Sequence, residues 1–462
     1  MGGRMKSRDI FDSVSPIDFR YWDEVAAGYL SENASIRYRL LTELSLVEVF
    51  HDNGMCLAEV VEEVKAACSR VTTAEVYEEE RRIRHDIRAL VNCIRANVGD
   101  EAKPFVHLMA TSYDIIDSDN AARYKDAMRY ALIPALVELE KVLIDITLRE
   151  ADTVQIGRTH GQHAVPITFG FAIAEYVSRL GGCIQTLNLL YPQLPGKFSG
   201  AVGAYNASSL FFDDPKKFEA EVLERLDLDA AEYSTQIVPP ESLSRILFEV
   251  ALAAGVMANL ARDMRNLQRT EIGEVGEEFA SDQVGSSTMP QKRNPINFEN
   301  AESLWKIVAP RIMTVLMDQV SEHQRDLTNS ASAKTYGEMI AYTVAMAKRL
   351  AGTMQKLVVD RENLKRNVEM QKDLILAEPL YLMLAKFGHP DAHEKVRVMT
   401  LQAGQERRTL GEVALGDEEM QRYLPMMTPH ARRILSDPSL YTGIAAKKAR
   451  AIAEQWRTEF GV

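Results

Sequence analysis

The chain has 462 residues, of which 46% are hydrophobic and 26% are charged, and its formal net charge is −12. A chain of this length buries a large core and is expected to form two or three domains. The acidic balance argues against a nucleic-acid-binding surface but not against a small cationic pocket. The four cysteines include no CxxC pair and no metal-ligand spacing, so we expect reduced, structural thiols.

Nothing near the N-terminus resembles a targeting signal. The first residues lack the apolar stretch of a secretory signal, and Lys6 stands where a myristoylation site needs Ser or Thr. The most apolar run, residues 247–261, is interrupted by Glu249 and is too short to span a bilayer. We therefore expect a cytoplasmic protein without a membrane partner.

Residues 1–115 mix helical patterns with short polar breaks. Residues 15–21 carry an Arg-Tyr pair, residues 84–86 are Arg-His-Asp, and residues 110–114 offer two adjacent hydroxyls. Each pattern has a structural interpretation, as a packed arm, a surface ion pair and a helix cap. The hydroxyls would equally suit phosphate or carboxylate oxygens.

From residue 116 to about 362 the apolar pattern is that of long helices. The clearest series has the alternating 3,4 spacing of a heptad seam and consists of Leu243, Ile246, Val250, Ala253, Met257, Leu260, Met264 and Leu267. Its mixture of small and large side chains suits packing inside a bundle. Further apolar helices are expected at 123–150 with Pro134 inside, at 299–320 with a kink at Pro310, and at 339–357.

The last hundred residues are again helical and highly charged. The sequence therefore predicts an all-α protein with three domains, namely an N-terminal helical domain (1–115), a central long-helix bundle (116–362) and a C-terminal helical domain (363–462).

Polar loops are expected between the long helices. Residues 157–163 contain HxxH, but neither HExxH nor a nearby carboxylate ligand accompanies it, so we expect no metal site. Residues 200–206 contain two glycines that do not form GxGxxG after a strand, so we expect no dinucleotide site. Residues 234–240 and 325–334 are, taken alone, connecting loops.

One further loop, residues 285–295, has the sequence GSSTMPQKRNP. Lys292 and Asn294 lie two residues apart and would point the same way in an extended segment, which suits a carboxylate or a developing enolate. For any single residue here a solvated surface loop is the simpler interpretation. Helical periodicity resumes after Pro295, so Glu299 is expected in a first helical turn.

The whole string from Ser286 to Glu299 resembles the GSSxMPxKxNP…E loop of the fumarase/aspartase superfamily, whose members eliminate fumarate from a succinyl compound. Residues 158–162 are similar to the RTHGQ motif of the adenylosuccinate lyase family. Gly161 distinguishes them from argininosuccinate lyases and fumarases, which usually carry Leu there. Five further segments resemble motifs of the same family and occur in the same order along the chain, at residues 15–21, 84–86, 111–112, 235–237 and 325–328.

This resemblance covers nearly the whole chain and implies a fumarase/aspartase-type fold with a long central helical bundle. It implies elimination of fumarate from adenylosuccinate, giving AMP, and from the succinyl-aminoimidazole-carboxamide ribotide of purine nucleotide biosynthesis. It further implies no cofactor, a small-molecule nucleotide substrate, and a homotetramer in which three chains contribute to each site.

The resemblance also implies catalytic roles. Ser286 would be the base and His160 the acid that protonates the leaving nitrogen. Glu299 would hydrogen-bond His160 and hold its tautomer. Lys292 and Asn294 would hold the fumaryl carboxylate.

Three sets of residues are expected by the same resemblance to surround the substrate. The succinyl group is expected to contact Thr111, Ser112 and Gln236. The ribose phosphate is expected to contact Arg20, Tyr21, Arg325 and Ser330. The site is also expected to include Arg84, His85, Asp86, Arg293, Asn300 and Lys334. The family usually has Arg where Lys334 stands. Lys keeps the positive charge but cannot form the two parallel hydrogen bonds that a guanidinium makes to a phosphate.

Two other interpretations are open. A sister lyase acting on argininosuccinate, aspartate or malate would need no nucleotide site, and Arg20, Tyr21 and Gly161 speak against it. A structural protein on this fold, such as a lens crystallin, would be favoured by loss of the base, the acid or the loop cation. All of these are present.

Overall fold

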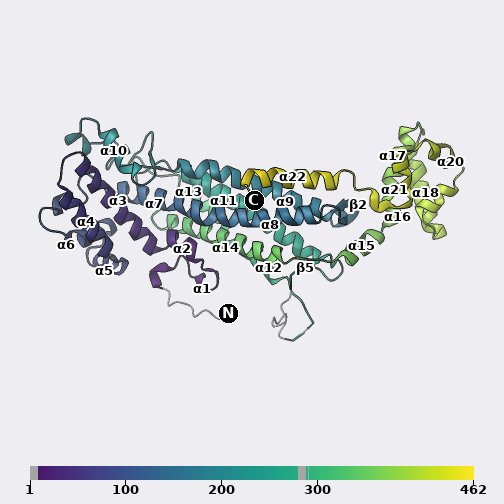
Figure 1. Ribbon diagram of the computed structural model, residues 1–462, viewed down its shortest axis with the longest axis horizontal. Helices are drawn as coiled ribbons and strands as arrows, with labels where there is room; N and C mark the ends of the chain where they lie inside the picture. Colours follow the sequence, from purple (N-terminus) through teal and green to yellow (C-terminus); the bar gives the residue numbers. More distant parts are fainter. Residues whose placement is uncertain (1–8, 279–287, 290) are drawn as a thin grey trace. The chain divides into compact units, whose positions relative to one another are not determined.

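The computed structural model describes residues 9–278, 288, 289 and 291–462. Helices dominate it, which confirms the all-α expectation (Figure 1). The chain packs as two compact units. The first unit comprises Met1–Glu138, Gly182–Ala258 and Asn300–Arg349, and the second comprises Leu139–Gly181, Asn259–Glu299 and Leu350–Val462. This division cuts through long helices instead of following the sequence, so the three-domain division stays a prediction.

The elements are as follows. The first unit holds α1 (Asp18–Tyr21), α2 (Glu24–Leu30), α3 (Glu32–Asp52), α4 (Ala58–Arg70), α5 (Thr73–Ile83), α6 (Asp86–Ala96), α7 (Ser112–Ala127), α10 (Pro215–Glu224), α13 (Arg311–Met317) and the parallel pair β3 (Pro195–Gly196) and β4 (Asp229–Ala230). Helices with residues in both units are α8 (Ile133–Arg149), α9 (Phe169–Leu190), α11 (Glu241–Leu267), α12 (Ile296–Val308) and α14 (Tyr336–Gln355). The second unit holds the antiparallel pairs β1 (Val154–Thr159) with β2 (Gln162–Thr168) and β5 (Val275–Gly276) with β6 (Val358–Val359), together with α15 (Arg361–Glu369), α16 (Lys372–Ile375), α17 (Ala377–Lys386), α18 (Ala392–Glu406), α19 (Leu410–Gly416), α20 (Met420–Tyr423), α21 (Pro429–Ser436) and α22 (Ala445–Phe460).

Helix α11 confirms the predicted heptad seam. The residues from Ile246 to Met264 in that series are at most 2% exposed. The helix is longer than the apolar run on which the sequence prediction relied, and by length and composition alone it could cross a membrane. However, 56% of its most apolar window is buried inside the protein, as expected of a core helix.

Prolines explain where two other expected helices are interrupted. Pro134 has no N–H to donate to the preceding turn, and the residues just before it, Met128–Leu132, form a wider π-helical turn between α7 and α8. Pro310 stands at the N-cap of α13, so the kink predicted there is a break between α12 and α13.

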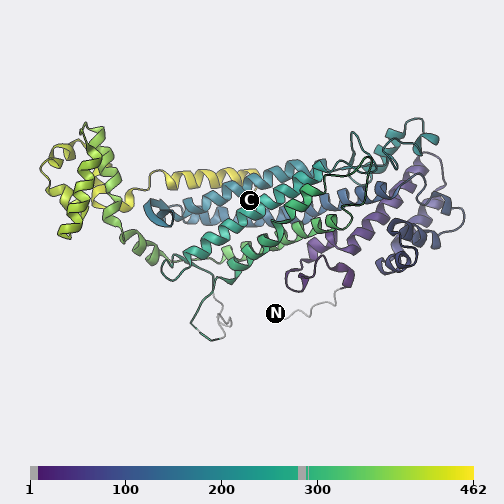
Figure 2. The ribbon, with the colours of Figure 1, turned by 180° about the vertical axis from the view of Figure 1, so that it is seen from behind.

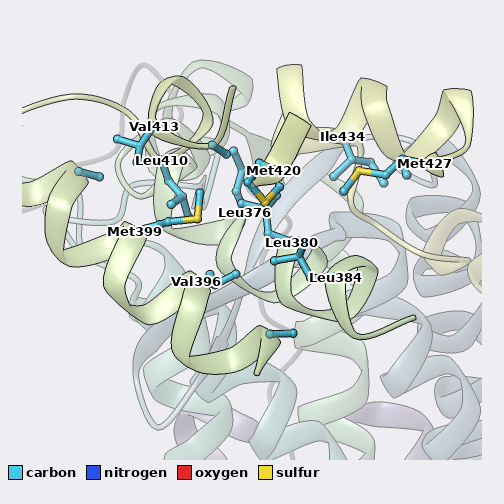
Figure 3. Packing of buried hydrophobic residues seen from close by; sticks show 14 residues of the cluster. Leu376, Leu380, Leu384, Val396, Met399, Leu410, Val413, Met420, Met427 and Ile434 are labelled. Atoms are coloured by element: carbon cyan, nitrogen blue, oxygen red, sulfur yellow. The ribbon is translucent and has the colours of Figure 1, made fainter. Parts of the chain in front are cut away.

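Close helix packing and a separate C-terminal core organise the second unit. Helices α9 and α22 lie side by side in both views (Figures 1 and 2). A Cβ atom at Gly181 would lie 2.5 Å from the Trp456 ring, so only glycine fits there. Figure 3 shows the core of α17 to α21, which is built from side chains including Leu376, Leu380, Leu384, Val396, Met399, Leu410, Val413, Met420, Met427 and Ile434.

Glu140 is a buried carboxylic acid on α8. Its side chain is fully buried, and neither carboxyl oxygen has a hydrogen-bond partner within the described residues. Loss of solvation on burial raises the pKa of Glu140 to about 9. The group is therefore protonated, and uncharged, at neutral pH.

Replacing Glu140 with glutamine should remove one component of the pH dependence of stability. Because the pKa of Glu140 is raised in the folded state, the folded chain binds more protons than the unfolded chain between pH 4.5 and about 9. Wild-type stability therefore falls as the pH rises through that window. Relative to wild type, the free energy of unfolding of Glu140→Gln should rise by on the order of 4 kcal/mol over the three pH units above 4.5.

Urea unfolding followed by circular dichroism at several pH values measures this difference. Glu138→Gln is the matched control, because Glu138 is exposed on the same helix. An identical pH dependence in wild type and Glu140→Gln would show that Glu140 ionises normally.

Candidate active site

His160 lies at the tip of a β-hairpin, where the sequence predicted a loop. Thr159 pairs with Gln162, and the two residues between them have φ values of 55° at His160 and 74° at Gly161. Positive φ at both central residues is the signature of a type I′ turn, the tightest hairpin connection. Gly adopts such angles freely, and His is among the residues that tolerate them. The turn leaves the His160 side chain exposed.

A buried carboxylate anchors this hairpin. Glu274 is 0% exposed and accepts hydrogen bonds from Gln155 at 2.8 Å and from Asn367 at 2.8 Å. Arg158 forms an ion pair with the same carboxylate, with Nη2 2.5 Å from Oε1. Arg158 of the RTHGQ motif therefore ties the hairpin to Glu274 close to its tip, two residues from the proposed acid.

The loop of residues 285–295 is described only in part, and Ser286 lies outside the described residues. Beyond it, the Arg293 carbonyl accepts a hydrogen bond from Gln268 Nε2 at 3.4 Å. The Glu277 carboxylate accepts hydrogen bonds from the backbone N–H groups of Asn297 and Phe298, at 2.9 and 3.0 Å. These contacts fix the end of the loop where α12 begins.

Glu299 lies in the first turn of α12, which confirms that prediction. Its side chain is exposed, as are those of Lys292 and Arg293, while Asn294 is half-buried. Within the described part of the single chain, Glu299 and His160 share no hydrogen bond. Their expected pairing therefore stays a prediction.

In the first unit, a second group of expected residues gathers at the N-terminus of α7. Thr111 is the N-cap residue, and its amide donates to Asp114 at 2.8 Å. Arg325 donates from Nη2 to the Tyr113 hydroxyl at 3.0 Å, and its guanidinium stacks 4.9 Å from the Tyr113 ring centre. The backbone N–H of Gln236 donates a hydrogen bond to the backbone carbonyl of Gln324 at 3.4 Å. The structure thus brings Thr111, Ser112, Gln236 and Arg325 into one neighbourhood.

Asp117 lies one helical turn beyond Tyr113 and was not among the site residues expected from the sequence. Asp117 accepts a hydrogen bond from the Val238 amide at 2.7 Å and so holds the segment that carries Gln236. Burial raises the pKa of Asp117 to about 7, although the Val238 amide and the charges of Lys197 and Arg325 oppose the rise. The spacing of four residues from Tyr113 was the only sequence signal that placed Asp117 on this face.

Asp86 of the Arg-His-Asp motif and Lys334 belong to one ionic network around Arg39 and Glu32. Arg39 contacts Asp119 at 2.9 Å and Asp86 at 3.5 Å. Glu32 lies 3.9 Å from Lys334. Burial would raise the pKa of Glu32, but Lys334, a hydrogen bond from Tyr77 and Arg39 together hold it below its usual value.

The remaining expected residues are more scattered. His85 is the N-cap of α6, and its Nδ1 accepts a hydrogen bond from the Arg88 amide at 3.2 Å. Asn300 donates to the Tyr21 hydroxyl at 2.9 Å, which links α12 to α1. The side chains of Arg20, Arg84 and Ser330 are exposed, and among the described residues no contact places them in either group.

Comparison with known proteins identifies the family. Residues 6–313 match the family described as Lyase, and residues 321–431 match the one described as Adenylosuccinate lyase C-terminal. A protein from Pyrococcus abyssi (strain GE5 / Orsay), described as adenylosuccinate lyase, is 38% identical over 420 residues, covering 89% of this chain and 92% of the relative. The chain belongs to the adenylosuccinate lyase family.

Other members of the wider superfamily are similar as well. An N-acetyl-S-(2-succino)cysteine lyase from Enterococcus italicus is 29% identical, covering 93% of each chain. The crystal structure of 3-carboxy-cis,cis-muconate lactonizing enzyme from Pseudomonas putida matches with a TM-score of 0.84 and 25% identity, covering 96% of this chain and 99% of that one. The expected fumarase/aspartase-type fold is therefore confirmed, and this member of the adenylosuccinate lyase family is a lyase.

Proposed function

We propose that the chain eliminates fumarate from adenylosuccinate, giving AMP, and from the succinyl-aminoimidazole-carboxamide ribotide. The observation that carries this proposal is the group at the N-terminus of α7. Hydroxyls of Thr111 and Ser112 at a helix N-terminus, with Arg325 held nearby by Tyr113, form a suitable environment for substrate anions. Family membership adds the expectation of a nucleotide substrate.

In the proposed reaction, Ser286 removes the proton next to a succinyl carboxylate. The electron pair moves into that carboxylate as an aci-carboxylate, which Lys292 and Asn294 stabilise. The carbon–nitrogen bond then breaks, and His160 protonates the leaving nitrogen. Serine is a weak base, so its alkoxide needs stabilisation by loop amides and cations, and water must be excluded.

Nucleotide binding is assigned to residues of the first unit. The ribose phosphate would be held by Arg20, Tyr21, Arg325 and Ser330, with Lys334 also at the phosphate. The arrangement of Tyr21 with Asn300 supports this assignment, because their hydrogen bond orients the phenol. Lys334 is more than half exposed, and its contact with Glu32 is long, so its ammonium is free to turn toward a phosphate.

Release of fumarate, followed by ultraviolet absorbance, tests the function. Adenylosuccinate should be cleaved at a rate at least about 100-fold above that of argininosuccinate, aspartate or a 2-succinocysteine, because a site that binds polar groups discriminates against ligands lacking them. Preferential cleavage of any of the other compounds would replace the proposal with that of a sister lyase.

Replacing Lys334 with arginine should lower KM for adenylosuccinate modestly and leave kcat unchanged. The guanidinium offers a phosphate two parallel hydrogen bonds, which strengthens ground-state and transition-state binding equally. Steady-state kinetics measure both constants, with Lys447→Arg on α22 as a matched control. A change in kcat without a change in KM would remove Lys334 from phosphate binding.

We also propose that the protein is a cytoplasmic homotetramer in which different chains share each active site. Exposed apolar side chains support an association. Met313, Leu316 and Met317 are each at least 41% exposed, and their spacing places them on one face of α13. Val320, just after the helix, is 77% exposed.

A further inference from the structure

A pocket with four basic side chains in its lining lies in the second unit, among residues that the proposed reaction does not use. It has a volume of about 470 Å³, within the range of small-molecule sites. Its walls come from the end of α8, the start of β1, helix α15 and the segment around residue 437. Val154, Leu364 and Val368 supply its apolar surface, and its basic side chains are Arg149, Arg361, Lys365 and Lys372.

A buried carboxylate holds two of these cations in place. Glu150 has a side chain only 3% exposed and accepts from Arg149 Nε at 2.9 Å and from Arg361 Nη2 at 3.0 Å. Burial would raise the pKa of Glu150, but a hydrogen bond from Thr153 and the two arginines keep it low. One nitrogen of each guanidinium is thus used, and the others have no hydrogen-bond partner within the described residues.

The charges divide the pocket into two ends. Lys365 lies one turn after Arg361 on the same face of α15 and has no ion-pair partner in the described chain. Arg149, Arg361 and Lys365 place three positive charges at this end, which Glu150 and Asp152 reduce to a net charge of about +1, although Asp152 is itself paired with Arg450. The three cationic side chains supply the charge-assisted donors that bind a phosphate monoester. At the other end Lys372 lies between Glu369 at 3.1 Å and Asp437 at 3.9 Å.

At this end the carboxylates of Glu369 and Asp437 can accept hydrogen bonds from the hydroxyl groups of a sugar, and so can the Ser439 hydroxyl oxygen, whose own proton is donated to Asp437. We propose that this pocket binds a small sugar phosphate, with its phosphate between Arg149, Arg361 and Lys365 and its hydroxyls toward Glu369 and Asp437. None of the residues that line this pocket is a proposed catalytic residue, and the inference does not depend on the proposed function.

Equilibrium dialysis with ribose 5-phosphate tests the proposal, with inorganic phosphate and ribose as further arms. Wild type should have a class of binding sites whose affinity falls at least about tenfold in Arg361→Gln/Lys365→Gln, since two charge-assisted contacts are removed. The matched control is Arg432→Gln/Lys447→Gln, which removes one exposed Arg and one exposed Lys outside the pocket. This control variant should bind ribose 5-phosphate with wild-type affinity. Lys334→Gln, which changes the proposed active site and not the pocket, should also keep wild-type affinity in this class of sites.

Hydrogen exchange provides a readout without substitution. Ribose 5-phosphate should slow exchange at amides of residues 149–156 and 361–372, and ribose should not. Unchanged binding in Arg361→Gln/Lys365→Gln, or no protection of these two segments, would overturn the proposal. Equal affinity for inorganic phosphate and ribose 5-phosphate would overturn its sugar component and leave a simple anion site.

Discussion

Replacing His160 with asparagine should lower kcat by about 100- to 10,000-fold, the usual contribution of a general acid. Asparagine is the informative replacement because it tolerates the positive φ of 55° that the first turn position requires. The hairpin should therefore stay folded while the proton donor is lost. Fumarate release measures the rate, and circular dichroism with thermal unfolding checks the fold.

Two neighbouring substitutions separate chemistry from folding. His163→Asn removes the other histidine of the hairpin and should keep activity within a fewfold of wild type. Gly161→Ala keeps the imidazole but places a side chain at a φ of 74°, so it should destabilise the turn by about 1 kcal/mol and displace His160. A His160→Asn variant with more than a tenth of wild-type kcat would exclude His160 as the acid.

The long helices could be predicted because their signal is repeated many times along the sequence. The seam of α11 depends on eight apolar positions, and no single residue decides it. Glu299 could be placed in the first turn of α12 because Pro295 marks where helical periodicity resumes. Thr111 could be recognised as a possible cap from its residue type alone.

The hairpin was missed because its turn consists of only two residues. His160-Gly161 is a less common type I′ pair than Asn-Gly, although the flanking Val154, Ile156 and Ile167 carry the β-branched signal of strands. The role of Arg158 was hidden for a different reason. Its partner Glu274 lies 116 residues further along the chain, and no local pattern encodes that contact.

The same limit applies to the candidate site. Motif resemblance could nominate Arg325 and Ser112 separately, but the stacking of Arg325 on Tyr113 joins residues 212 positions apart. Asp117 was overlooked because its function depends on the Val238 amide, which only the folded chain brings near. Residue types are thus predictable from motifs, whereas the contacts that orient them arise from tertiary packing.

Mixing two inactive variants should restore activity if the proposed sites are shared between chains. Ser286→Ala lacks the proposed base and should not turn over, although it should still bind substrate. His160→Asn lacks the proposed acid. The two residues lie 126 positions apart in the sequence, with the 27-residue helix α11 between them. The length of α11 does not keep them apart, because the Arg158–Glu274 ion pair brings the segment after α11 back to the hairpin that carries His160. The proposal that the base and the acid come from different chains therefore follows from the family resemblance.

After dissociation and reassociation of an equal mixture, a site is active when its base comes from a His160→Asn chain and its acid from a Ser286→Ala chain. These are two independent choices, each with a probability of one half, so about one quarter of wild-type activity should appear in a symmetric oligomer. Co-purification of differently tagged chains confirms that mixing has occurred, and each variant reassociated alone is the control. If mixed oligomers form but remain inactive, the base and the acid of each site belong to a single chain. The loop that carries Ser286 must then reach His160 within that chain.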